Sequence, residues 1–282
     1  MKKNKNGAYK HIVNTNFKHI LKPEKFYSVC VDNFFANPDL IRNFGLNLPK
    51  TSHSGGVWPG KRSKELCYVD LELNTAILLK VFSVYFDLRY ENIEWENSSV
   101  CFQQIKKYSN DKNNIKNKGW IHQDSDMSFA GVIYLTPNID PNSGTSLYDL
   151  KENEKENYMT YGIPYSKHLL FKGEKIKEEL HKNNFEKHNN KFIEKTRFQN
   201  IYNRMICYDS KEFHAANSFF SEGDERLTII FFVNNIKVKK NPLDRVKDID
   251  SFDNIIEERI KLKNENIKSE EKLPKQTNIS DK

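Results

Sequence analysis

Two residues of types that bind metal ions stand close together in the segment GWIHQDSD. His122 and Asp124 are separated by one residue, so on an extended chain their side chains point to the same side. An imidazole nitrogen beside a carboxylate oxygen suits a first-row metal ion. We therefore expect a metal site here, completed by a third ligand from elsewhere in the chain.

His214 is the best candidate for the third ligand. It follows an apolar run at 205–208 and precedes another at 227–233, and both runs could form strands beside it. Two histidines and one carboxylate leave the other positions of a metal open, as in non-haem Fe(II) centres. Asp126 shares the strand face of Asp124 and could compete with it, but we expect it to act behind the ligands or on the substrate side. The remaining histidines lie in polar or unpatterned contexts, and we interpret them as surface or hydrogen-bonded core residues: His11, His19, His53, His168, His181 and His188.

The composition predicts one domain with extensions. The chain has 282 residues, and its four cysteines form no CxxC pair, so neither a zinc ribbon nor a disulfide framework is indicated. No run of apolar residues is long enough for a membrane span, and the first residues lack the apolar segment of a signal peptide. These features predict a soluble, cytoplasmic protein that does not enter a membrane.

The net charge of +7 is compatible with a nucleic-acid partner. However, lysine is spread along the whole chain together with glutamate and asparagine, which favours a compositional bias of the genome as the explanation.

The first third of the chain predicts supporting elements. A short strand is expected at 26–32, followed by a helix that Asn37 caps and that stops before Pro49. A second amphipathic helix is expected over 74–86, with Asn74 as its cap. Between the helices, residues 55–63 contain three glycines, a proline, a tryptophan and two cations, which predicts a loop. This loop is either a structural turn or a substrate-side loop over a pocket.

From position 99 onward, short apolar runs alternate with turn residues. Such a pattern predicts a sandwich or jelly-roll barrel, with strands at 99–108, 129–136, 144–150, 202–209 and 226–236. We expect the turn at 136–144 to link two antiparallel strands. Residues 151–200 form a charged insertion, with a helix near 174–182, that is too long for an ordinary barrel loop and is typical of a lid or binding loop.

The resulting domain plan has three parts. We expect a polar N-terminal extension, a domain that holds the site, and a polar tail with a helix near 252–263 and a disordered end. Their boundaries are 1–25, 26–238 and 239–282, and the middle domain comprises helical support at 37–90, a β core at 99–236 and the insertion at 151–200.

Taken together, the motifs resemble the Fe(II)/2-oxoglutarate-dependent dioxygenases, in particular the prolyl-4-hydroxylase-like branch. The resemblance rests on the His122-x-Asp124 pair, the strand VIYL at 132–135, the segment GTSLY at 144–148, His214, and Arg226 twelve residues beyond it. It covers roughly residues 26–236. The resemblance implies a mainly β fold with flanking helices, whose core is a distorted double-stranded β-helix of the jelly-roll, cupin-like type.

The resemblance also implies the roles of individual residues. His122, Asp124 and His214 would ligate Fe(II), with 2-oxoglutarate and O2 as cosubstrates, and Arg226 would hold the distal carboxylate of 2-oxoglutarate. A guanidinium suits that role because it offers two parallel donors and keeps its charge when desolvated. Thr228 shares the strand face of Arg226 and could donate to the same carboxylate. Tyr134 and Tyr108 resemble the cosubstrate-contacting tyrosines of prolyl hydroxylases, although Tyr108 could equally end a strand facing water.

The implied reaction is hydroxylation of a C–H bond of a protein side chain or a small metabolite, with release of succinate and CO2. Asp124 argues against halogenation, because halogenases of the family have a small residue at that position. Phe232 stands where the nucleobase-demethylase branch has a second arginine, so we do not expect a nucleic-acid substrate. The alternative is a non-catalytic double-stranded β-helix protein that binds a ligand or a nucleic acid.

Overall fold

The structure is a computed structural model, and it describes residues 24–124, 128–154, 165–223, 225–247 and 258–265. The chain divides into two units, and the fold below is that of the unit Pro23–Pro242. In the other unit, which comprises Met1–Lys22 and Leu243–Lys282, the described helical residues belong to α5 (Pro242–Lys247) and to 258–265. No helix among the described residues is both long enough and apolar enough to cross a membrane.

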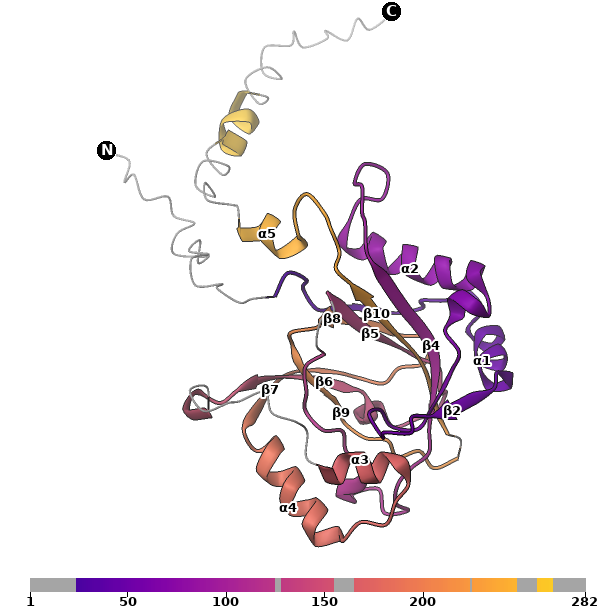
Figure 1. The fold of residues 1–282 in the computed structure, drawn as a ribbon. Helices are drawn as coiled ribbons and strands as arrows, with labels where there is room; N and C mark the ends of the chain where they lie inside the picture. The colour runs from indigo at the N-terminus through magenta and orange to yellow at the C-terminus, as the bar shows by residue number, and fades with distance from the viewer. Residues whose placement is uncertain (1–23, 125–127, 155–164, 224, 248–257, 266–282) are drawn as a thin grey trace, which may run out of the picture. The chain divides into compact units, whose positions relative to one another are not determined.

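The larger of two sheets has seven strands, all paired antiparallel (Figure 1). Its central strand β10 pairs with β4 on one side and with β5 on the other, in an unbroken register that matches Arg226 with Ile105 and Thr228 with Tyr134. In spatial order the strands are β1 (Val29–Val31), β8 (Met205–Asp209), β5 (Phe129–Tyr134), β10 (Arg226–Asn234), β4 (Asn97–Ile105), β3 (Lys61–Ser63) and β2 (Lys50–Ser52).

Two helices cover one face of this sheet and close the main core. Helix α1 (Pro38–Asn47) begins at its predicted cap, because the side chain of Asn37 accepts the backbone N–H of Leu40 at 3.3 Å. Helix α2 (Leu71–Tyr85) begins earlier than predicted, since Asp70 is the cap and Asn74 lies inside the helix. Buried side chains of α2 pack with those of β4, β5, β8 and β10 in one apolar cluster.

The alternation of strand side chains gives the large sheet two different faces. Along β10, Leu227 and Ile229 belong to the core under the helices, whereas Arg226, Thr228 and Phe232 line a cavity on the opposite face. The apolar residues therefore anchor the strand, and the polar ones are presented to the cavity.

The smaller sheet has three antiparallel strands in the order β7 (Phe192–Phe198), β6 (Thr145–Leu150) and β9 (Phe213–Ala216). The described sheets are mostly antiparallel and flanked by helices, consistent with a jelly-roll-like core, and they do not close into a barrel. The turn at 136–144, predicted to link two antiparallel strands, does not join two strands of one sheet. It carries the chain from β5 in the large sheet to β6 in the small one, so it connects the two sheets.

The segment predicted as an insertion at 151–200 is only partly a loop. It holds α3 (Tyr165–Lys172) and α4 (Glu178–Asn189), and it ends in β7, which pairs with β6. The strand was missed because its sequence FIEKTRF has mostly exposed positions and so lacks the apolar pattern of a core strand. The loop predicted at 55–63 likewise ends in β3. The predicted extension at 1–25, the first half of the helix near 252–263 and the disordered end fall almost entirely outside the described residues.

Candidate metal centre

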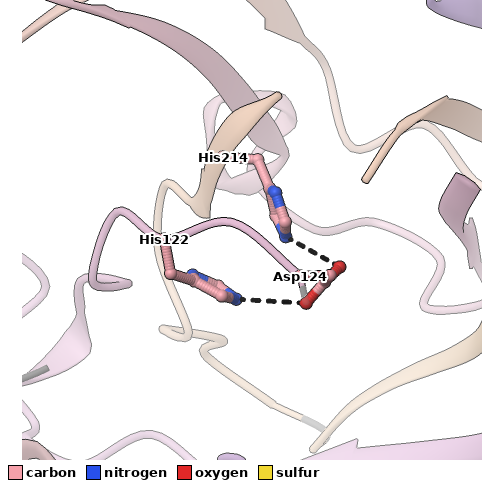
Figure 2. Close-up of side chains that lie close together, drawn as sticks. All are labelled: His122, Asp124 and His214. Atoms are coloured by element: carbon pink, nitrogen blue, oxygen red, sulfur yellow. Dashed lines mark ion pairs between the residues drawn. The ribbon is translucent and has the colours of Figure 1, made fainter. Parts of the chain in front are cut away.

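Three side chains point toward one another, as Figure 2 shows. The ligand atoms of His122, Asp124 and His214 all lie within 4.8 Å of one another. Asp124 lies between the two imidazoles, with Oδ1 3.9 Å from His122 Nε2 and Oδ2 3.4 Å from His214 Nε2. His214 lies far beyond the His122 and Asp124 pair in the sequence, and the fold brings it to them.

Backbone pairing between the two histidines holds this arrangement in place. The N–H of His122 donates to the carbonyl of His214 at 3.0 Å, and the N–H of His214 donates back to His122 at 2.8 Å. The N–H of Asp124 donates to the carbonyl of Ser210 at 3.1 Å. The segment 122–124 is therefore fixed against β9 and the turn before it, so the spacing of the three ligands is set by main-chain hydrogen bonds.

Hydrogen bonds to backbone carbonyls also orient both imidazoles. Nδ1 of His122 lies 2.8 Å from the carbonyl oxygen of Trp120, and Nδ1 of His214 lies 2.9 Å from that of Glu212. A carbonyl oxygen can only accept, so each Nδ1 carries the proton and each Nε2 presents a lone pair toward Asp124. Metal-binding histidines usually donate their other ring N–H in this way, and the hydrogen bond fixes the orientation of the ring.

The electrostatics of the site suit a cation. Burial, then the neighbouring His214 and Lys167, lower the pKa of His122 well below its usual value, so its imidazole is neutral at physiological pH. Within the described residues, the buried Oδ2 of Asp124 has no hydrogen-bond partner. A buried carboxylate oxygen without a donor is costly unless a cation neutralises it. The donor set of two imidazoles and one carboxylate therefore fits Fe(II), and it leaves further coordination positions open toward the cavity.

The cavity beside the three ligands has a volume of about 740 Å³ and is lined by both sheets. That volume is in the range of sites for drug-sized ligands. Its walls include side chains of β4, β5 and β10 from the large sheet, and Thr145, His214 and Ala216 from the small one. The loop at 57–59, β3 and α3 also contribute residues. The segments predicted as candidate substrate-side elements thus reach the same cavity as the ligands.

Arg226 lies in this cavity and is almost fully buried, with 3% of its surface exposed. Its Nη1 donates to the carbonyl of Ser218 at 2.9 Å, and its guanidinium carbon lies 5.8 Å from the ring centre of Tyr134. Its buried Nε has no hydrogen-bond partner in the described part of the chain. Burial lowers the pKa of Arg226, because the charged guanidinium is removed from solvent. A buried guanidinium in this state fits an anionic ligand.

The other three predicted cosubstrate residues are placed differently from one another. Thr228 lines the cavity, and its hydroxyl lies 3.5 Å from the carbonyl of Gln103. Tyr134 and Tyr108 stand behind the residues that line it. The phenol of Tyr134 donates to Oγ1 of Thr145 at 2.9 Å, and that of Tyr108 accepts the N–H of Gly60 at 3.2 Å. Thr228 therefore faces the cavity, whereas the phenol groups of Tyr134 and Tyr108 do not. Asp126 lies outside the described residues.

Three further cavity residues were not singled out from the sequence. Tyr208 packs its ring 4.7 Å from that of His214, and the cations Arg62 and Lys167 reach the cavity from β3 and α3. The strand alternation that places Arg226 and Thr228 on one face applies equally to Tyr208 on β8 and could have found it. Lys167 belongs to a helix that the sequence pattern did not predict.

Comparison with known families decides what the chain belongs to. A family model described as "Family of unknown function (DUF6445)" matches residues 15–222. The chain is a member of this family. No curated protein matches the sequence.

Solved structures match over about three quarters of the chain, at low sequence identity. One is HygX from Streptomyces hygroscopicus with nickel, 2-oxoglutarate and hygromycin B bound, at 12% identity and a TM-score of 0.42, covering 74% of this chain and 83% of that one. A prolyl-4-hydroxylase from Pseudomonas putida matches at 11% identity and a TM-score of 0.37, over 74% of this chain and 92% of the other. EvdO2 from Micromonospora carbonacea var. aurantiaca matches at 9% identity and a TM-score of 0.45, over 76% and 89%.

Proposed function

We propose that the chain is an Fe(II)- and 2-oxoglutarate-dependent dioxygenase that hydroxylates a C–H bond of a small molecule or a protein side chain. The observation that carries the proposal is the combination of two features in one cavity. His122, Asp124 and His214 bring their ligand atoms within 4.8 Å of one another, and the same cavity contains the buried Arg226 with an unpartnered Nε. A three-residue metal site that leaves open positions, together with a cation for a carboxylate, is what this chemistry requires.

In the proposed arrangement the three ligands hold Fe(II) through Nε2 of each histidine and a carboxylate oxygen of Asp124. Iron and 2-oxoglutarate, when bound, supply the oxidation by O2 that yields succinate, CO2 and a hydroxylated product. Because Asp124 occupies the carboxylate position, the proposed outcome is hydroxylation and not halogenation.

The protein's own contribution is to orient the cosubstrate. Arg226 donates to the distal carboxylate of 2-oxoglutarate, with Thr228 beside it on the same strand face. Tyr134 supports the guanidinium through its ring and holds Thr145 through its hydroxyl, so its proposed role is positioning. Tyr108 stacks on Phe171, which lines the cavity, at a centroid distance of 5.8 Å. We further propose that residues 26–238 form the oxygenase domain and that its two sheets are the halves of a distorted double-stranded β-helix.

The decisive experiment is an anaerobic titration of the purified full chain with Fe(II) and then 2-oxoglutarate. The proposal predicts a visible charge-transfer band when 2-oxoglutarate is added, and succinate formation after air is admitted. The His214→Ala variant should show neither signal. A wild-type protein without the band and without succinate would overturn the proposal in favour of a non-catalytic ligand-binding protein.

A further inference from the structure

A second arginine, the half-buried Arg62, faces the cavity apart from the one proposed to hold 2-oxoglutarate. The guanidinium carbon of Arg62 lies 4.2 Å from the ring centre of Trp58 and 5.8 Å from that of Phe232. Its buried Nε has no hydrogen-bond partner in the described part of the chain, and no described acid pairs with the group. Contact with two aromatic rings holds the guanidinium in place and leaves its N–H edge free to donate.

Lys167 brings a second cation to the same cavity from α3. Only 6% of its surface is exposed, and its Nζ lies 5.4 Å from the ring centre of Phe171. Among the residues described, no carboxylate forms an ion pair with it. Burial lowers the pKa of Lys167 to about 8 and that of Arg62 to about 10, while Asp124 acts in the opposite direction on both. Both groups are therefore still mainly charged near pH 7.

Charge balance shows that these two cations are not needed by the proposed cosubstrate. The charges of Fe(II), Asp124, the two carboxylates of 2-oxoglutarate and Arg226 cancel one another. Arg62 and Lys167 then face one remaining lining carboxylate, that of Glu65. Burying cations without anions is unfavourable, so the excess positive charge calls for an anionic ligand.

We propose that Arg62 and Lys167 bind the carboxylate or phosphate group of a small anionic substrate, whose apolar part packs against Trp58 and Phe232. This inference rests on the proposed function, since it assigns the substrate class of that same cavity. Arginine provides a planar pair of donors that matches an oxyanion, and lysine adds a point charge. The volume of about 740 Å³ is in the range for drug-sized ligands, so there is room for a small molecule in addition to 2-oxoglutarate.

The test is a calorimetric titration of the full chain, loaded anaerobically with Fe(II) and saturating 2-oxoglutarate, at fixed ionic strength. The probes are benzoate, phenyl phosphate and benzamide, which share one ring and differ in charge. We expect at least one of the two anions to bind about tenfold or more tightly than benzamide, because charge-assisted hydrogen bonds are stronger than those between neutral groups. The order of benzoate and phenyl phosphate distinguishes a carboxylate from a phosphate substrate.

Variants assign this preference to the two cations. Arg62→Met and Lys167→Met should each reduce the preference for the anion about tenfold, and Arg62→Lys should retain part of it. Lys61→Met is the matched control, because Lys61 is exposed on the same strand and should leave the preference unchanged. Thermal unfolding of each variant reports whether it folds. If Arg62→Met does not fold, Lys167→Met and Arg62→Lys carry the test.

Three outcomes would overturn the anion site. These are equal binding of all three probes by the wild type, an unchanged preference in both cation variants, or a loss of 2-oxoglutarate affinity in Arg62→Met as large as in Arg226→Met. The same titrations on the metal-free protein separate this proposal from the proposed function. Anion preference that depends on Arg62, in a protein whose Fe(II)-loaded form does not bind 2-oxoglutarate, would reject the oxygenase and keep the anion site. A charge-transfer band without anion preference would keep the oxygenase and reject the anion site.

Discussion

The Nε2 atom of His188 lies 2.7 Å from the carbonyl oxygen of Ile121, the residue that directly precedes the proposed ligand His122. Asn189, the next residue of α4, adds two contacts at 3.3 Å, since it accepts the N–H of Ile121 and donates to the carbonyl of Gly119. Helix α4 therefore fixes the backbone on the side opposite to β9. This part of the predicted insertion is a support of the metal site.

Replacing His188 should weaken metal binding even though it is not a ligand. In His188→Ala the carbonyl of Ile121 loses its donor and the segment before His122 gains freedom. We expect the affinity for Fe(II) to fall about tenfold, the order found for residues that orient metal ligands. Competition with a chelator measures the affinity. Lys187→Ala, on the exposed side of the same helix, is the control, and equal affinities in the two variants would contradict the role of His188.

Metal binding should stabilise the folded protein only when the three ligands are intact. At a free metal concentration of about 100 times the dissociation constant, a ligand that binds only the folded state adds about 2.7 kcal/mol to the free energy of unfolding. Asp124→Asn and His214→Ala should lose this gain. Asp87→Asn makes the same chemical change at a surface carboxylate that pairs with Arg89, and it should keep the gain. Denaturant unfolding with and without Mn(II) under air, or Fe(II) without oxygen, measures it. A full gain in His214→Ala would remove that residue from the metal site.

Much of this site could be predicted because its determinants are local in the sequence. The two-residue spacing of His122 and Asp124 and the alternation along β10 both translate directly into side-chain direction, and Arg226 and Thr228 do line one cavity face. Alternation alone, however, predicts on which face of the sheet a side chain lies, and not whether its end group reaches the cavity. Tyr134 lies on β5 beside the cavity, yet its phenol turns to Thr145, which the strand pattern could not reveal.

The parts that could not be predicted depend on contacts between distant segments. The loop at 55–63 and α3 meet where Nδ1 of His168 lies 3.1 Å from the carbonyl of Gly56. Gly56 has a φ of +65°, and a Cβ atom there would stand 2.2 Å from the backbone oxygen of His168, so the close approach requires glycine. No pattern within either segment encodes this pairing. For the same reason, the cations that these segments bring into the cavity were not assigned from the sequence.

Arg226 should be required for binding 2-oxoglutarate but not for folding. Arg226→Met removes a charge-assisted donor, which corresponds to a loss of up to about 3 kcal/mol, or roughly a hundredfold in affinity for 2-oxoglutarate. The metal-free variant should unfold within about 1 kcal/mol of the wild type or be more stable, because the substitution removes a buried charge with no carboxylate partner. Titration followed by the charge-transfer band gives the affinity, and urea unfolding gives the stability. Arg204→Met, which removes the pair with Asp32, should leave the affinity unchanged. Unchanged 2-oxoglutarate binding in Arg226→Met would mean that another residue binds the distal carboxylate of 2-oxoglutarate.

Lys167 should give the metal-free protein a stability that rises with pH in an alkaline window. Its pKa is about 8 in the folded state, where burial disfavours the charge, and about 10.4 in the unfolded chain. Between these values the unfolded chain binds more protons, so the free energy of unfolding increases with pH, by up to about 3 kcal/mol for this group. Lys167→Met should lack this contribution, and the difference between wild type and variant cancels the other titrating groups. Urea unfolding at pH 7.5 and pH 10.5 measures the difference, with Lys61→Met as the exposed control. A difference that does not change between the two pH values would mean that Lys167 reaches solvent and does not face the cavity as a buried cation.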